Sequence, residues 1–69
     1  MITIFVNGEA QTVSSPSTVQ EIVESKCGSP VPTGVAVALN LAVVPRAKWT
    51  STTLEEDDNL EILWASSGG

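Results

Sequence analysis

Apolar residues alternate with polar ones, or run together, in short stretches that predict strands at both ends of the chain. Residues 2–6 (ITIFV) are mostly β-branched or aromatic and predict a first strand, with even-numbered side chains on one face and odd-numbered ones on the other. Asn7-Gly8 follows, which is the strongest short signal for a hairpin because a type I′ turn needs a positive φ at both central residues. Residues 10–14 (AQTVS) are therefore expected to return as an antiparallel second strand.

The hydrophobic period changes from two to about 3.6 residues after the break at residues 15–17. Thr18 and Glu21 have the spacing of a capping box, in which the Thr hydroxyl accepts from the Glu amide and the Glu carboxylate reaches back. Gly28 stands where a helix commonly ends on a glycine. Between these ends, apolar residues mark one buried face of a helix of about nine residues: Val19, Ile22, Val23 and Cys27. Cys27 is expected to pack there as a small apolar side chain, with a reactive thiol as the alternative.

Three further strands are predicted after the helix. They are residues 35–39 (VAVAL), 42–44 (AVV) and 60–64 (LEILW). The first of them is apolar throughout, so it is expected to be buried on both faces. Asn40 is a natural turn residue behind it, and Pro45 ends the short strand that follows. Residues 46–49 are expected to close one helical turn, and Leu54 is an apolar anchor before the acidic segment 55–58.

This order of elements predicts an α+β domain over residues 1–64. One main helix that covers one face of a mixed, four- to five-stranded sheet would bury the apolar faces of both in a chain of this length. Residues 65–69 (ASSGG) are small or polar and are expected to form a flexible C-terminal tail.

Length and charge restrict the classes of partner. A chain of 69 residues is one domain, with no room for a roomy ligand cavity. Three Lys and Arg residues stand against eight Asp and Glu residues, which gives a net charge of −5. Because nucleic acids and anionic membranes are bound mainly through Lys and Arg, neither is expected as a partner. The sequence has no long apolar run or recognisable signal peptide, and its one cysteine has no disulfide partner, so we expect a cytoplasmic protein.

The residues for catalysis are sparse. Histidine and tyrosine are absent, which removes the usual general base and the commonest metal ligand. One cysteine excludes a CxxC redox pair and a zinc knuckle. The acidic segment 55–58 lacks the alternating spacing and central glycine of a calcium loop, so it is expected to be a solvated loop. The sequence therefore predicts neither an enzyme nor a metal site.

The last two residues, Gly68-Gly69, change this picture. A Gly-Gly end after this order of strands and helix resembles the ubiquitin-like β-grasp proteins. The resemblance narrows over the segments Val37-Ala38-Leu39-Asn40 and Val43-Val44-Pro45-Arg46, which are followed by Trp49. These segments resemble ThiS, the family of small sulfur carriers of thiamine biosynthesis, and the resemblance spans the whole chain.

The resemblance implies that the chemistry takes place on the carboxylate of Gly69. At neutral pH a carboxylate is a poor electrophile, so a ThiF-like, ATP-dependent adenylyltransferase would convert it to an acyl-adenylate. Sulfur would then replace AMP, and the terminal thiocarboxylate would donate it to a ThiG-like thiazole synthase. No bound cofactor is implied; the glycyl adenylate and 1-thioglycine are covalent states of the C-terminus. Gly68, Ser67 and Ser66 would be recognised by these enzymes, and the free protein would be a monomer.

Two other functions share the Gly-Gly end. One is a sulfur carrier of another pathway, similar to the small subunit of molybdopterin synthase. The other is a ubiquitin-like modifier or interaction module.

A partner-binding patch is expected on the open face of the sheet. If alternate residues of the first and last strands point toward the helix, Phe5, Glu61 and Leu63 point outward. In a β-grasp sheet these strands are adjacent, so Phe5 and Leu63 are expected to be neighbours and to mark an interaction site. Trp49 is expected to pack in the core rather than to contact a partner. Arg46 pairs either with the acidic segment or with a partner.

Overall fold

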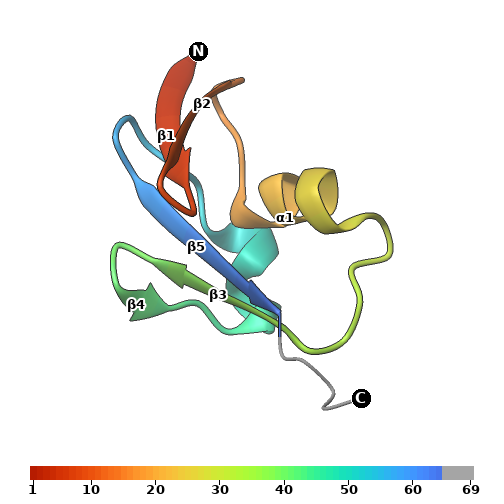
Figure 1. Ribbon diagram of the computed structural model, residues 1–69. Coiled ribbons are helices and arrows are strands. Elements are labelled where there is room, and N and C mark those ends of the chain that lie inside the picture. Colours follow the sequence, from red (N-terminus) through yellow and green to blue (C-terminus); the bar gives the residue numbers. More distant parts are fainter. Residues whose placement is uncertain (65–69) are drawn as a thin grey trace.

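The computed structural model describes residues 1–64 and has the element order expected from the sequence (Figure 1). Residues Ser66, Ser67, Gly68 and Gly69, and with them the expected tail, lie outside the described residues. The elements are β1 (Ile2–Val6), β2 (Glu9–Val13), α1 (Val19–Cys27), β3 (Val35–Leu39), β4 (Ala42–Val43), the 3₁₀ helix η1 (Arg46–Ser51) and β5 (Asn59–Trp64).

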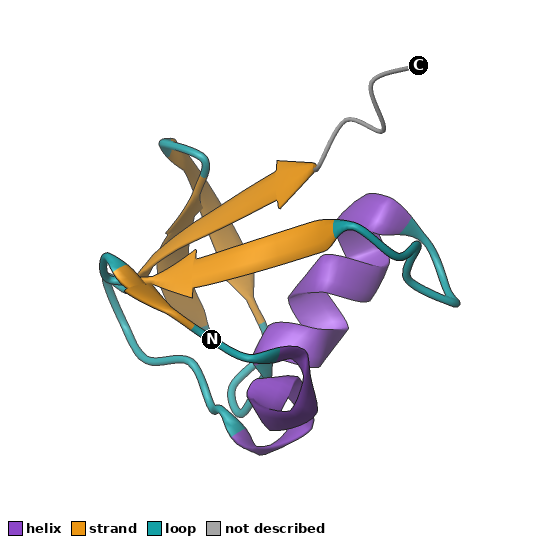
Figure 2. Ribbon diagram, turned by 90° about the horizontal axis from the view of Figure 1, so that it is seen from below, coloured by secondary structure: helices purple, strands orange, loops and turns teal. Residues whose placement is uncertain are grey.

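The strands form one five-stranded mixed sheet in the order β2-β1-β5-β3-β4. β5, the last strand in sequence, lies at the centre; it runs parallel to β1 and antiparallel to β3. α1 packs across one face of this sheet (Figure 2). The sequence prediction of a mixed sheet with one main helix on one face is therefore confirmed. No helix among residues 1–64 has the length and apolar character needed to cross a membrane.

The β1–β2 hairpin turns at the expected pair of residues. Asn7 has φ 51° and Gly8 has φ 87°, so both central residues occupy the left-handed region that a type I′ turn requires. Val6 pairs directly with Glu9 across this two-residue turn. For that reason β2 begins one residue earlier than expected.

Both ends of α1 are closed as the sequence indicates. The Thr18 backbone N–H donates to Glu21 Oε1 (2.9 Å), and the Glu21 N–H donates to Thr18 Oγ1 (3.3 Å), which completes a capping box. At the other end Gly28 has φ 93°, and its N–H donates to the Glu24 carbonyl (2.9 Å). Cys27 packs against the core in part, as expected for a small apolar residue on the buried face of the helix.

The core lies between the sheet and α1 and is closed at the side by η1. It contains twelve buried apolar residues: Ile4, Val6, Val19, Ile22, Val23, Val31, Val35, Val37, Trp49, Leu54, Leu60 and Ile62. Trp49 is 1% exposed, and its Nε1–H donates to the Val44 carbonyl (2.9 Å), which confirms its expected place in the core.

Arg46 binds the backbone of a loop instead of the acidic segment. Its guanidinium donates to the carbonyl oxygens of Val31 (2.6 Å) and Pro32 (3.1 Å). The same group lies 5.0 Å from the ring centroid of Trp49, within the range of a cation–π interaction. Arg46 therefore fixes the segment before β3 against η1.

The expectation that β3 is buried on both faces is wrong. Val35 and Val37 are buried, whereas Ala36 is exposed and Ala38 is partly exposed. One helix covers only one face of the sheet, so the alternate residues of a central strand stay open. Alanine is small enough to occupy such positions with little apolar surface exposed.

Candidate functional site

The central strand β5 leads directly to residue 65, so its anchoring decides where the C-terminal residues start. β1 ends at Val6, before β5 does, and the side chain of Asn7 continues the pairing. Asn7 Oδ1 accepts from the Ile62 N–H (2.8 Å), and Asn7 Nδ2 donates to the Ile62 carbonyl (3.3 Å). Asn7 thus replaces a missing residue of the β1–β5 ladder.

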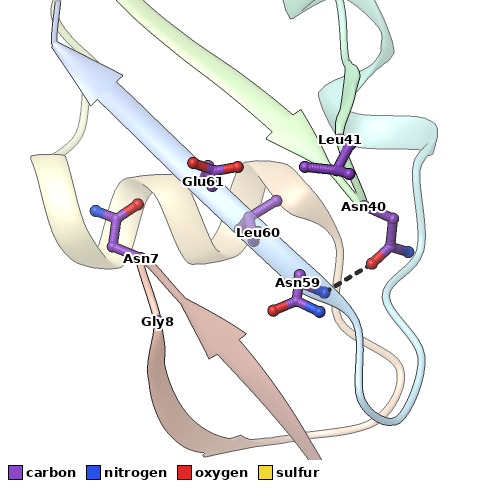
Figure 3. A pocket seen from close by; sticks show the side chains of 7 residues that line it. All are labelled: Asn7, Gly8, Asn40, Leu41, Asn59, Leu60 and Glu61. Carbon is purple, nitrogen blue, oxygen red and sulfur yellow. Dashed lines mark hydrogen bonds between the residues drawn. The ribbon is translucent and has the colours of Figure 1, made fainter.

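Asn40 anchors the other side of β5 in the same way. Its backbone N–H donates to the Asn59 carbonyl (2.7 Å), and its Oδ1 accepts from the Asn59 N–H (2.9 Å; Figure 3). Its Nδ2 donates to Asp58 Oδ1 (3.0 Å). The sequence identified Asn40 as a turn residue and as part of a segment that resembles the ThiS family, but gave no sign of its contacts with β5.

The acidic segment 55–58 is largely exposed, as expected, but it also has a structural role. Asp58 Oδ2 accepts from the Glu55 N–H (2.8 Å), which closes the turn on itself. Glu56 Oε1 accepts from the Thr3 N–H (3.2 Å), and the Asp57 N–H donates to the Thr3 carbonyl (2.7 Å). These bonds extend the edge of β1 at the amino end of β5, the end opposite to residue 65. Among residues 1–64, no group of three His, Cys, Asp or Glu side chains is arranged to hold a metal ion.

Phe5, Glu61 and Leu63 all lie on the face of the sheet away from α1, because the buried residues Ile4, Val6, Leu60 and Ile62 alternate with them along β1 and β5. The expected contact between Phe5 and Leu63 is wrong. β1 and β5 pair only through Phe5–Asn59 and Val6–Leu60, so Leu63 lies four residues, about 13 Å, beyond the partner of Phe5. Phe5 is also half-buried, whereas Leu63 is 57% exposed.

Leu63 belongs instead to an apolar strip that crosses β5, β3 and β4. Leu63 pairs with Ala36, and Ala38, two residues along the same face, pairs with both Glu61 and Val43. Val43 is 77% exposed. We call Leu63, Ala36, Ala38 and Val43 the outer strip; Glu61 lies beside it on β5.

A hollow lies next to the outer strip, over the first half of β5. It has a volume of about 630 Å³ and lies between the two asparagine-containing turns (Figure 3). Seven residues line it: Asn7, Gly8, Asn40, Leu41, Asn59, Leu60 and Glu61. The sequence placed Glu61 on this face but did not indicate that the two turns enclose a hollow around it.

A smaller groove lies at the carboxyl end of α1. Lys26, Cys27 and Trp64 line it together with the ends of β1, β2 and β5. Trp64 pairs with Val35 at the end of the sheet and is 58% exposed. An aromatic side chain therefore stands exposed at the last described residue, immediately before residue 65.

Comparisons with known proteins give one consistent result. The model of the ThiS family matches residues 4–69. The crystal structure of a thiamine biosynthesis protein (ThiS) from Geobacter metallireducens is 30% identical, with a TM-score of 0.78 over 99% of this chain and 100% of that one. An NMR solution structure of a thiamine biosynthesis protein from the same organism is 29% identical, with a TM-score of 0.76 over 99% of this chain and 88% of that one. No curated protein matches the chain significantly.

Proposed function

The chain belongs to the ThiS family and has its β-grasp fold, and we propose from this that it carries sulfur for the formation of the thiazole ring of thiamine. The observation that carries the proposal is the match to the family over residues 4–69, a range that includes Gly68-Gly69. The similar Geobacter metallireducens protein is named a thiamine biosynthesis protein, which supports the same pathway. In this role the chain is the substrate of other enzymes and is not itself a catalyst.

The proposed chemistry takes place on the carboxylate of Gly69. A carboxylate oxygen attacks the α-phosphate of ATP, which forms an acyl-adenylate and releases pyrophosphate. The terminal sulfur of a persulfide then attacks the acyl carbon, and AMP leaves. This leaves an acyl disulfide, and a thiol then attacks the donor's sulfur atom, which forms a new disulfide on the donor and releases the thiocarboxylate of residue 69. Adenylation is needed because AMP is a good leaving group, whereas the oxygen of a bare carboxylate is not.

The anchoring of β5 indicates that this strand is a rigid support for the C-terminal residues that react. Hydrogen bonds from Asn7 and Asn40 add to the ladders with β1 and β3, so β5 is tied along both edges. Sites built on rigid elements hold reacting groups more accurately than sites built on loops. We propose that the activating enzyme recognises Ser66, Ser67 and Gly68, which lie in sequence between β5 and the reacting glycine.

The face of the sheet away from α1 is the proposed contact surface for the activating enzyme and for the thiazole synthase. Contiguous exposed apolar groups commonly mark interaction sites, and the outer strip is such a group. We propose Leu63 as its contact nearest to the tail and Glu61 as a charged contact beside it. Phe5 is a separate proposed contact, since the register places it at the other end of β5.

Intact-mass spectrometry tests the proposed chemistry. The chain is incubated with a ThiF-like activating enzyme, ATP, a persulfide donor and a thiol, and the expected product has one oxygen replaced by sulfur. Deletion of Gly69, or addition of one residue after it, should abolish this exchange, because the reacting carboxylate is then displaced. Thermal melting of both variants serves as the control for folding. An extended protein that still acquired sulfur at its C-terminus would contradict the proposal, and conjugation to other proteins would indicate a modifier instead.

The pathway that uses the sulfur is tested by offering the thiocarboxylate form of the chain to two acceptor enzymes. A thiazole synthase should consume the thiocarboxylate and return the carboxylate form of the chain, whereas a molybdopterin synthase large subunit should not. Transfer to the latter alone would assign the carrier to a different pathway. The free thiol of Cys27 and the use of ATP support a cytoplasmic location, which we include in the proposal.

A further inference from the structure

The two turns beside the hollow differ in one residue. In the β1–β2 turn the second central residue is Gly8, which adopts φ 87° without steric conflict. In the β3–β4 turn the equivalent residue is Leu41, with φ 72°. A Cβ atom makes the left-handed region sterically unfavourable, and only glycine, asparagine and aspartate adopt it routinely. Leu41 therefore carries backbone strain that Gly8 does not.

Leu41 gains no packing in return for this strain. Its side chain is 90% exposed, the largest exposed fraction of any bulky apolar residue in the part of the chain that the structure describes. Residues with strained backbone conformations are concentrated at functional sites and ligand contacts. Both the exposed apolar side chain of Leu41 and its positive φ are unfavourable for the isolated protein. We therefore expect Leu41 to make a favourable contact in a complex.

The hollow beside Leu41 has a negative charge with no cation next to it. Glu61 is the one ionisable residue in its lining, and it is exposed. Lys26, Arg46 and Lys48 are the lysines and arginines of the chain, and none of them lines the hollow. Asn59 adds a carboxamide on the same strand (Figure 3). The hollow therefore combines an apolar wall with a carboxylate and an amide oxygen.

We propose that this hollow receives an arginine side chain of the activating enzyme. The methylene groups of an arginine are apolar and would lie against Leu41, while its planar guanidinium would donate to the Glu61 carboxylate and to the side-chain amide oxygen of Asn59. Pairs of this kind are directional, so they fix the orientation of a partner as well as attract it. This inference rests on the proposed function in one respect, that the partner is the activating enzyme. It makes Leu41 and Glu61 specificity-determining residues.

The charge is tested with substitutions of Glu61 and a matched acidic residue on the opposite face. Glu9 is also an exposed strand residue, but it pairs with Val6 and so lies on the face that α1 covers. Glu61→Gln should raise the Kd for the activating enzyme about 3–10-fold and Glu61→Lys more than about tenfold, since like charges at an interface repel. Glu9→Gln and Glu9→Lys should leave it unchanged. The wild-type Kd should rise with added salt more steeply than that of Glu61→Gln.

The apolar wall is tested with two substitutions of Leu41. Leu41→Met keeps an apolar side chain and the backbone strain, whereas Leu41→Asn suits the left-handed region and removes the apolar surface. Leu41→Asn should leave the melting temperature unchanged or raise it, and it should weaken binding about three- to tenfold, in the range of a moderate interface contact. Leu41→Met should bind as the wild type does. If Leu41 had a purely structural role, Leu41→Asn would melt at a lower temperature than Leu41→Met, and the two variants would bind the activating enzyme equally well.

The failure of this inference is distinct from failure of the proposed function. If the wild-type chain receives no sulfur from the activating enzyme, the proposed function is wrong. If it receives sulfur normally, but Glu61 variants bind as Glu9 variants do or Leu41→Asn binds as the wild type, the assignment of the hollow is overturned. Weaker binding of Glu61→Lys and Leu41→Asn, with wild-type binding by the Glu9 variants and by Leu41→Met, supports it.

Discussion

Leu60 and Leu63 are the same residue type on the same strand, three positions apart, yet one is 1% exposed and the other 57% exposed. Leu60 faces α1 and belongs to the core, whereas Leu63 lies on the outer strip. The two faces of the sheet thus differ in burial and in the role that we assign to each. One face stabilises the fold, and the other exposes the apolar and charged groups that we propose as partner contacts, although the same strands supply both with a period of two.

The two tryptophans give the largest expected contrast between these environments. Trp49→Ala should cost about 3–5 kcal/mol in the free energy of unfolding, because it opens a cavity in the core and leaves the Val44 carbonyl without its donor. Trp64→Ala, at a position that is 58% exposed, should cost about 1 kcal/mol or less. Denaturant unfolding measures both. Equal losses for the two variants would mean that Trp64 packs more closely than its exposure indicates.

The buried face of α1 should give the next largest effect. Ile22→Ala should cost about 2–5 kcal/mol, since Ile22 packs between the helix and the sheet. Ser25→Ala on the exposed side of the same helix is the control, and it should change stability by less than about 0.5 kcal/mol. Equilibrium unfolding that placed the two variants within error of each other would overturn the assignment of the buried face.

Local signals were sufficient for the parts of the fold that form within a few residues. The Asn7-Gly8 turn, the capping box at Thr18 and the apolar stripe of α1 depend only on neighbours in sequence, and all three were predictable. The parallel pairing of β1 with β5 joins residues more than fifty positions apart, and its register is not encoded in either strand alone. That is why the expected contact between Phe5 and Leu63 was wrong.

Burial of β3 and the roles of the asparagines failed to emerge from the sequence for a related reason. An all-apolar strand such as 35–39 does not reveal that a single helix leaves Ala36 and Ala38 open. Asn7 and Asn40 are favoured in turns, and that local preference conceals their hydrogen bonds to β5. The candidate reacting group at the Gly-Gly end could be proposed from the sequence alone, whereas the hollow could be recognised only in the assembled sheet.

The cap of α1 should have a smaller effect than its buried face. Thr18→Ala removes the side-chain acceptor of the Glu21 N–H and should cost about 1 kcal/mol. Thr18→Ser keeps a hydroxyl at the same position and should retain most of the stability. Thermal melting that ranked Thr18→Ala as more damaging than Ile22→Ala would contradict the assigned contributions of the cap and the core.

The outer strip should show the smallest effect on stability and a clear effect on binding. Leu63→Ser combined with Val43→Ser should change the free energy of unfolding by about 1 kcal/mol or less, because both side chains are largely exposed. The same double variant should weaken binding of the activating enzyme by about tenfold or more if the strip forms the apolar centre of the interface. Thr12→Ala is the control, since Thr12 is exposed on β2 and pairs with Thr3, away from the strip. A double variant that unfolded would show that the strip supports the fold. One that bound at wild-type affinity would show that the partner docks elsewhere. Either result would contradict the assignment of stability to one face of the sheet and of partner binding to the other.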